Sequence, residues 1–186
     1  MKASLILILF SVLLNFNLSA HSGRTNSYGC HNNHQTGDYH CHGSYLKKEI
    51  REDKNDLIIE AGHDGYKKKF GYLHYRKIKY SKQNNSFLGE DILVSKKIKL
   101  NSINFVIRFH LSPSTKATKT QDGKSILISL ENGEGWIFKS NDEIINLEKG
   151  LFFGDKKNIL NSENIAIVGT TKNITKNINW ELEKVS

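Results

Sequence analysis

Apolar and polar residues alternate through most of the second half of the chain, and this period of two limits the fold more than any other feature. In residues 104–111 (NFVIRFHL), Phe105, Ile107 and Phe109 alternate with more polar neighbours. Successive side chains of a strand point to opposite faces of its sheet, so the pattern predicts a half-buried strand. The chain has one proline, and no stretch carries the apolar stripe of an amphipathic helix.

Other short runs have a similar strand-like composition and are separated by turn signals. Asn132-Gly133 lies between two apolar runs, which is the strongest short-range sign of a β-hairpin, and Asp122-Gly123 marks another turn. The further strand candidates are Leu57–Ala61, Tyr72–Tyr80, Ser125–Leu130, Trp136–Phe138, Ile144–Leu147, Leu151–Phe153, Ile165–Gly169 and Ile178–Lys184. Many short strands at near-regular spacing predict an all-β fold, an antiparallel β-sandwich that is partial in extent.

The first 20 residues have the pattern of a secretory signal peptide. Lys2 supplies a positive start, Leu5–Leu14 is an apolar run, and Ala20 offers a small residue before the cut. The apolar run is too short to span a bilayer as a helix, although an uncleaved anchor is the alternative. We therefore expect an exported protein, in the periplasm or cell envelope or secreted, with no membrane span after cleavage.

The chain is basic, with a formal net charge of +8 and a pI near 9.4. Scattered lysines usually form a solvated surface. The alternative is a face that concentrates anionic partners, since fixed positive charge attracts polyanions. For an exported protein, such a partner is an acidic polysaccharide or an anionic lipid. No motif indicates binding to nucleic acid.

Residues 21–44 are rich in Cys, His, Gly and Asn and nearly empty of aliphatic residues. Five of the eight histidines of the protein lie between His21 and His42. A segment without aliphatic residues builds no core, so a metal or a disulfide must hold its shape. Zinc prefers four ligands drawn from thiolate and imidazole. The candidate ligands are His21, Cys30, His31, His40, Cys41 and His42.

Three interpretations of this irregular N-terminal segment remain open. Export favours a Cys30–Cys41 disulfide without metal, and closing so short a loop would stabilise the segment by roughly 2–3 kcal/mol. The second interpretation is zinc bound through both Cys and His. The third is the same disulfide together with a metal site made of histidines alone. The segment also resembles the small Cys/His-rich "YHYH" segment of exported bacterial proteins, which favours metal binding. Residues 45–56 are charged and indicate a linker or a short exposed helix.

Several polar residues of the β region are candidates for binding a ligand. His63 begins an Asp-Gly turn that leads towards Tyr66. His74 and Arg76 would project from the same side of one strand, where an arginine can hold a carboxylate in a bidentate manner. Arg108 is a further candidate contact for a glycan. The acidic pair at residues 90–91 is explained equally well as a solvated turn.

Four motifs that follow one another in order carry a resemblance to a known family. They are HDGYKKKFGYLHYRKIKY (63–80), FLGEDIL (87–93), FVIRFHLSPSTKATKTQDGKSILISLENGEGWIF (105–138) and FFGD (152–155). Together they resemble the end of the C-terminal β-sandwich of heparinase II/III polysaccharide lyases, over about residues 57–186. The resemblance implies a β-sandwich and acidic polysaccharide as the partner.

The family's chemistry is β-elimination, in which a Tyr or His removes the proton next to a uronate carboxylate. In the family these groups come mainly from a helical toroid and the first part of the sandwich. We therefore expect a chain that lacks the full catalytic apparatus, so lyase activity is an open question and no catalytic residue is assigned. His63 would match a histidine that binds a structural metal in some members.

The sequence thus predicts an exported heparinase II/III-like module that associates with acidic polysaccharide. The alternative is an exported non-enzymatic protein that binds a metal, with zinc the candidate, through its Cys/His segment. A partial sandwich leaves strand edges and apolar surface exposed, so we also expect a homodimer or a partner chain.

Overall fold

A computed structural model describes residues 30–32, 39–41, 45–140, 144–152 and 159–185. Within these residues the chain is built from antiparallel strands and a single turn of helix, which confirms the all-β prediction. No helix in the described part is long and apolar enough to cross a membrane. The expected signal peptide, residues 1–20, lies outside the described residues and stays a prediction.

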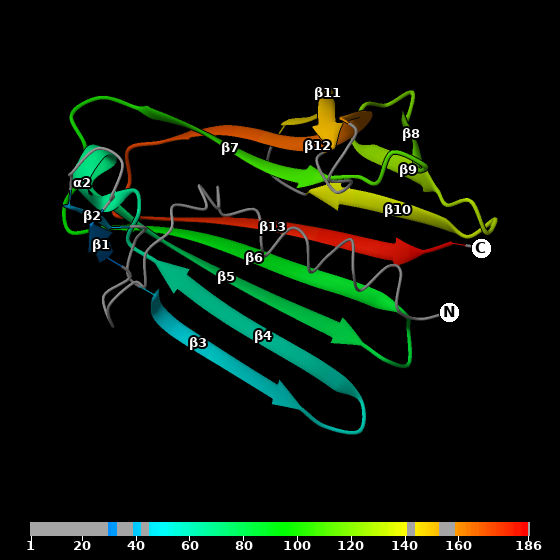
Figure 1. Cartoon of the computed structure of the whole chain (residues 1–186), viewed down its shortest axis with the longest axis horizontal. Coiled ribbons are helices and arrows are strands. Elements are labelled where there is room, and N and C mark those ends of the chain that lie inside the picture. Colours follow the sequence, from blue (N-terminus) through cyan, green and yellow to red (C-terminus); the bar gives the residue numbers. More distant parts are fainter. Residues whose placement is uncertain (1–29, 33–38, 42–44, 141–143, 153–158, 186) are drawn as a thin grey trace.

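The larger sheet has eight strands (Figure 1). In spatial order they are β3 (Tyr45–Glu52), β4 (Asp56–His63), β5 (Tyr72–Ser81), β6 (Ser86–Ser95), β13 (Thr175–Lys184), β10 (Gly135–Ser140), β9 (Ser125–Ser129) and β8 (Lys116–Lys119). Strands β3 to β6 and β13 are long, and β8 to β10 are short. The pair β9–β10 is the hairpin predicted at Asn132-Gly133, and Gly133 has the positive φ of 83° that such a turn requires.

The smaller sheet has three strands and forms a second layer. Its strands, in order, are β11 (Ile144–Phe152), β12 (Leu160–Thr171) and β7 (Ile103–His110). The two sheets meet at aromatic side chains: the Phe109 ring of β7 lies 4.8 Å from the Trp180 ring of β13 and 4.9 Å from the Phe138 ring of β10. This apolar layer between two sheets is the core of a sandwich, as the alternation of apolar residues predicted.

The core does not extend under the whole of the larger sheet. Its buried cluster consists of Ile78, Phe87, Phe109, Leu111, Ile126, Ile128, Trp136, Phe138, Ile145, Ile165, Ile167, Ile178, Trp180 and Leu182. Among the described side chains, β3 and β4 contribute none of these residues. The sandwich is therefore two layers deep over β6, β13, β10 and β9, and it thins out towards β3.

Three elements correct the expectations from the sequence. The segment 45–56, expected as a linker or a short helix, contains strand β3, which pairs with β4. The acidic pair Glu90-Asp91, for which a solvated turn was one of two open explanations, lies inside strand β6. Between β4 and β5 the chain forms a one-turn helix, α2 (Lys67–Phe70), where the sequence indicated only a turn leading into a strand.

The Cys/His segment contributes a two-stranded hairpin of β1 (Cys30–Asn32) and β2 (Tyr39–Cys41). Its backbone register places Cys30 opposite Cys41 and His31 opposite His40. The other two candidate ligands of the segment, His21 and His42, lie outside the described residues.

Candidate functional site

The carboxylate of Asp91 is completely buried, with 0% of the residue exposed. Three donors from two neighbouring strands satisfy it. His74 Nε2 lies 2.6 Å and Arg76 Nε 2.7 Å from Oδ1, and Trp180 Nε1 donates to Oδ2 over 2.9 Å. The strand register explains the arrangement, because Arg76 of β5 is the direct partner of Asp91 in β6. A buried charge needs such partners, since an unpaired one would be prohibitively costly.

Gly89 makes room for the tryptophan that completes this network. Trp180 is its direct partner on β13, and a Cβ atom added at Gly89 would lie 1.9 Å from Cε2 of the indole. The indole therefore lies flat over the backbone of β6 at a point where only glycine fits. Its ring nitrogen can then reach the carboxylate of Asp91 two residues further along the strand.

A chain of hydrogen bonds leads from Asp91 to the turn before α2. The backbone N–H of Gly65 donates to His63 Nδ1 over 3.2 Å, so a neutral His63 carries its proton on Nε2. That nitrogen lies 3.1 Å from His74 Nδ1 and donates to it, which leaves the proton of His74 on Nε2, facing Asp91. Each ring nitrogen of the two histidines thus has a partner when both rings are neutral.

The electrostatics of the network agree with this assignment. Burial, followed by the neighbouring His74, lowers the pKa of His63 to about 4, so His63 is neutral at physiological pH. Burial alone would raise the pKa of Asp91, but the Arg76 charge and the His74 hydrogen bond outweigh it and lower that pKa to about 2. Asp91 is therefore ionised throughout the physiological range.

The network anchors the turn that carries α2. The Tyr66 ring lies 5.0 Å from the His63 ring, in an edge-to-face arrangement, and precedes the helix. The turn closes through the N–H of Lys67, which donates to the carbonyl of Asp64 over 2.8 Å. The helix ends at Gly71, whose φ of 75° is left-handed and whose N–H returns to the carbonyl of Lys67. Tyr66 and Phe70 both remain exposed.

Lysines from three separate segments gather beside α2, and we call this surface the lysine end. It comprises Lys67, Lys68 and Lys69 of α2, Lys96, Lys97 and Lys99 of the β6–β7 loop, and Lys172 of the β12–β13 turn. The backbone joins two of the segments, since the N–H of Lys99 donates to the carbonyl of Lys172 over 2.8 Å. The Lys99 Nζ lies over the Tyr72 ring, 5.3 Å from its centroid. In Figure 1 this end of the sheet lies at the left, around α2.

None of the seven lysines forms a salt bridge with a described residue, whereas three lysines on β5, β10 and β13 of the larger sheet are paired. Lys79 binds Asp56 at 2.8 Å, Lys139 binds Glu183 at 2.7 Å, and Lys184 binds Glu134 at 2.9 Å. The lysine end therefore presents positive charge that the described part of the chain does not neutralise. Exposed apolar side chains, Ile98 and Leu100 among them, lie between these lysines.

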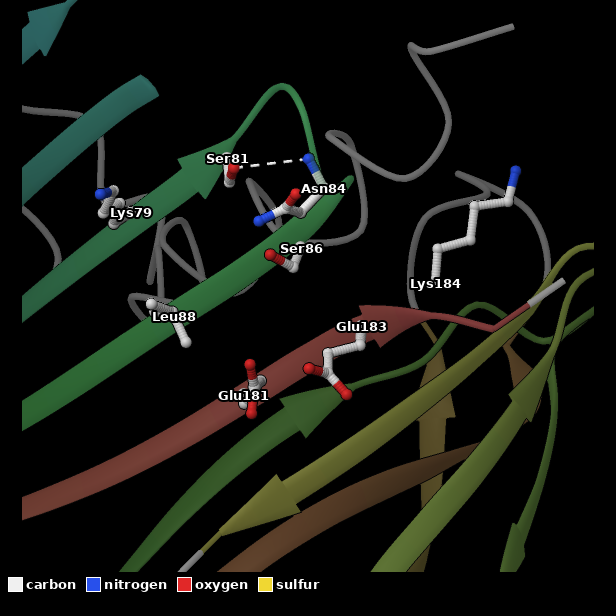
Figure 2. Close-up of a pocket in the computed structure, with 8 residues that line it drawn as sticks. All are labelled: Lys79, Ser81, Asn84, Ser86, Leu88, Glu181, Glu183 and Lys184. Carbon is white, nitrogen blue, oxygen red and sulfur yellow. Dashed lines mark hydrogen bonds between the residues drawn. The ribbon is translucent and has the colours of Figure 1, made fainter. Parts of the chain in front are cut away.

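A groove on the face of the larger sheet that points away from the core differs from the lysine end in its charge (Figure 2). It lies at the β5–β6 turn and is lined by Lys79, Ser81, Asn84, Ser86, Leu88, Glu181, Glu183 and Lys184. Both of its lysines are paired with acids, and burial together with the nearby Glu183 raises the pKa of Glu181. Its lysines are thus already paired, which makes it a poor site for an anion.

The structure brings together three of the residues singled out in the sequence. His63, His74 and Arg76 meet in the Asp91 network, where the two histidines use both of their ring nitrogens. Arg108 lies apart, on β7, where its Nε binds Glu148 of β11 at 2.8 Å. The role of His74, Arg76 and Arg108 as glycan contacts stays a prediction. Among the described residues, no three His, Cys, Asp or Glu side chains gather as metal ligands. The role of His63 as a metal ligand stays a prediction.

Two parts of the site could not be recognised from the sequence alone. Asp91 gave no signal because its partners Arg76 and Trp180 are 15 and 89 residues away along the chain. The lysine end draws on segments that only the topology brings together. The KKK of residues 67–69 and the KKIK of residues 96–99 were visible in the sequence, but their proximity was not.

Comparison with known proteins places the chain in a recognised group. It matches the family model described as "Heparinase II/III-like, C-terminal" over residues 24–181. This match begins earlier in the chain than residue 57, where the resemblance carried by the motifs began. A curated relative, FtsZ-localized protein C of Caulobacter vibrioides, is 26% identical over 98 residues, which is 49% of this chain and 17% of that protein.

Solved structures share the fold. The heparan sulfate lyase HepC of Pedobacter heparinus aligns with a TM-score of 0.65 at 13% identity, over 77% of this chain and 22% of that one. A heparinase III, the BT4657 gene product, aligns with a TM-score of 0.61 at 12% identity, over 76% of this chain and 22% of that one. The chain spans less than a quarter of the length of each of these proteins.

Proposed function

The chain belongs to the heparinase II/III-like C-terminal family, and we propose that it is an exported module that binds acidic polysaccharide through its lysine end. The observation that carries the proposal is the gathering of seven lysines without acidic partners beside α2, in the part of the chain that the structure describes. Elsewhere on the same sheet, Lys79, Lys139 and Lys184 are each paired with an acid.

The chemistry of an acidic glycan fits such a surface. Its carboxylate or sulfate groups recur along the chain, and ammonium groups on three adjacent segments can meet several of them at once. Unpaired lysines bind an anion without first breaking an internal ion pair, and the clustered charge raises the local concentration of anionic ligands. Tyr66 and Phe70 add exposed aromatic faces next to the lysines, against which the C–H face of a sugar ring can pack.

The Asp91 network supports this role by holding the surface in place. It fixes the position of His63, and through Gly65 and Tyr66 it fixes the turn that starts α2. A binding surface gains affinity when its side chains are carried by a preorganised backbone, because less conformational entropy is lost on binding.

We propose that the chain binds the acidic glycan without cleaving it. A general base in β-elimination needs a nitrogen or oxygen free to accept the substrate proton. In the described part of the site, His63 and His74 have both ring nitrogens in hydrogen bonds, and Asp91 accepts three. The name of one neighbour, a heparan sulfate lyase, supports an acidic glycan as the ligand class.

The test compares two triple variants that carry the same change of charge. Lys67→Gln, Lys68→Gln and Lys69→Gln together alter the lysine end. The matched control changes Lys116, Lys119 and Lys124 to Gln, at the β8–β9 side of the molecule, where these lysines are likewise exposed and form no salt bridge with described residues. Retention on immobilised heparan sulfate is measured against salt concentration, since screening weakens exposed charge interactions.

We expect wild-type protein and control to elute at similar salt, and the lysine-end variant to elute clearly earlier. Equal elution of both variants would show that binding, if any, follows net charge alone. A parallel arm uses vesicles with anionic lipid, because Ile98 and Leu100 are exposed among the lysines. Binding to vesicles but not to glycan would overturn the glycan assignment. Absorbance of unsaturated uronate products during incubation would overturn the absence of turnover.

A further inference from the structure

Strand β3 (Tyr45–Glu52) is the outermost strand of the larger sheet. It pairs with β4 on one side, and no described strand pairs with its other side (Figure 1). An edge strand of eight residues presents alternate N–H and C=O groups that are ready to pair with another strand. The strand at the opposite edge, β8, has only four residues and begins and ends with lysine, which is a common way to protect an edge.

We infer that the free edge of β3 pairs antiparallel with β3 of a second copy, about a two-fold axis at Ile50. The sequence of this strand is complementary to itself in that register. Glu49 of one copy lies opposite Arg51 of the other, and Lys48 lies opposite Glu52. One position further out, Lys47 would come opposite Asp53, the first residue after the strand. By the two-fold symmetry each of these pairs occurs twice, and every one of them joins opposite charges.

Neighbouring registers lack this complementarity. Moving the axis by half a residue, to between Glu49 and Ile50, places Lys48 opposite Arg51. Moving it by a whole residue, to Glu49, places Glu49 opposite itself. An axis between Ile50 and Arg51 places Glu49 opposite Glu52, and an axis at Arg51 places Arg51 opposite itself. Like charges directly opposite each other destabilise a strand pair. Of these five registers, only the one centred on Ile50 opposes no like charges.

The apolar residues point to the same register. Ile50 is the partner of Ile59 in β4, and Ile59 is the partner of Ile78 in β5. Exposure rises towards the edge along this row: Ile78 is 5% exposed, Ile59 is half-buried, and Ile50 is 58% exposed. A second Ile50 across the axis would extend the row to six isoleucines and cover the one that is most exposed. Both copies would present the row on the same face, because the axis is perpendicular to the sheet.

The pairing also adds a contact to a charged cluster of the single chain. Glu49 lies directly opposite Glu60 of β4, and in the single chain Arg51 bridges the two carboxylates, at 2.9 Å from Glu49 and 3.1 Å from Glu60. In the paired form, Arg51 of the second copy would flank Glu49 from the other side. The dimer would hold four carboxylates and two guanidinium groups, the same ratio as the single chain, but each Glu49 would be flanked by the arginines of both copies. The inference does not depend on the proposed function.

The test is the mass of the purified protein by light scattering over a wide range of concentration. We expect a dimer whose dissociation depends on concentration. In Ile50→Lys, two ammonium groups would face each other across the axis, and the mass should halve. The matched control is Leu127→Lys on β9, an apolar residue that is 44% exposed and has strand neighbours on both sides. This control should remain a dimer, and circular dichroism checks that both variants are folded.

A charge exchange tests the register itself. Arg51→Glu should weaken the dimer at least tenfold, because Glu49 would then face a glutamate. The double variant Glu49→Arg with Arg51→Glu restores opposite charges across the axis and should recover the dimer. A wild-type protein that is monomeric at every concentration would overturn the inference, and so would a dimer that survives Ile50→Lys. Failure of the double variant to regain the dimer would refute the Ile50-centred register.

Discussion

The Nε2 atom of His74 lies 2.6 Å from Oδ1 of Asp91, a carboxylate without any exposed surface. This contact links the interior of the sandwich to its surface, because His74 in turn receives the Nε2 proton of His63 at the start of the turn before α2. The shape of the lysine end thus depends on a charge buried between the two sheets.

Asp91→Asn should destabilise the protein by about 3 kcal/mol. The change leaves the guanidinium of Arg76 buried without its counter-charge, and removing one partner of a buried ion pair typically costs about 3–5 kcal/mol. Unfolding in urea measures the difference. The neighbouring change Glu90→Gln, on the other face of β6, should alter the stability by less than about 0.5 kcal/mol. Equal effects of the two variants would contradict the role given to Asp91.

Stability should fall as the pH is lowered from about 6.5 towards 4. The pKa of His63 is lowered from its ordinary value of 6.5 to about 4 in the folded protein, so in this window the unfolded chain binds more protons than the native one. The free energy of unfolding therefore decreases as protons are added. Protonation would also place a proton on Nδ1 of His63, against the N–H of Gly65 that donates to this nitrogen in the neutral form.

His63→Asn removes this titration while keeping an acceptor near the N–H of Gly65. The slope of the unfolding free energy between pH 6.5 and 4 should be smaller in this variant than in the wild-type protein. His110→Asn, on strand β7 and away from the network, serves as the control and should leave the slope unchanged. A wild-type slope that persists in His63→Asn would assign the pH dependence to other groups.

Gly89→Ala should destabilise the protein by about 1–3 kcal/mol and change its fluorescence. The new methyl group would overlap the indole of Trp180, which must move and lose its hydrogen bond to Asp91. The fluorescence emission of the protein should therefore shift. Leu88→Ala, at the adjacent position that is 49% exposed, should leave the emission unchanged. Unaltered emission in Gly89→Ala would show that the indole does not need this space.

The strands could be predicted where one face is buried and the other is not. In β7, β9 and β10 the apolar residues alternate with polar ones or stand between clear turns, so local pattern and tertiary structure agree. Strand β6 was missed because Gly89, Glu90 and Asp91 in its middle have the composition of a turn. They are tolerated there because Trp180 needs the space over Gly89 and Arg76 needs the charge of Asp91. Neither reason is visible within a local window.

Strand β3 was missed for a different reason. Its residues are mostly charged because it is an edge strand, and edges carry charge to avoid unwanted pairing. In sequence, the same composition is typical of a linker. Only the pairing with β4 shows that the charges belong to a strand. The lysine end was unpredictable in the same sense, since its three segments are brought together by the order of the strands rather than by their spacing in the chain.

The hairpin of β1 and β2 makes the open question about Cys30 and Cys41 testable. Its register places the two cysteines directly opposite each other. Opposed residues of an antiparallel pair have Cα atoms about 4.5–5.5 Å apart, within the range of about 4.4–6.8 Å that disulfides span. We therefore predict a Cys30–Cys41 disulfide in protein recovered from an oxidising compartment. The titration of free thiols should give none before reduction and two after it.

Metal analysis of the same sample separates the remaining interpretations. No free thiol and no metal would support the disulfide alone, and no free thiol with one bound metal would support a site of histidines beside the disulfide. Two free thiols with one bound zinc would contradict the disulfide and support binding through Cys and His. Cys30→Ser with Cys41→Ser provides the control: it should keep the glycan retention of the lysine end, because the hairpin and the α2 surface are separate elements of the chain.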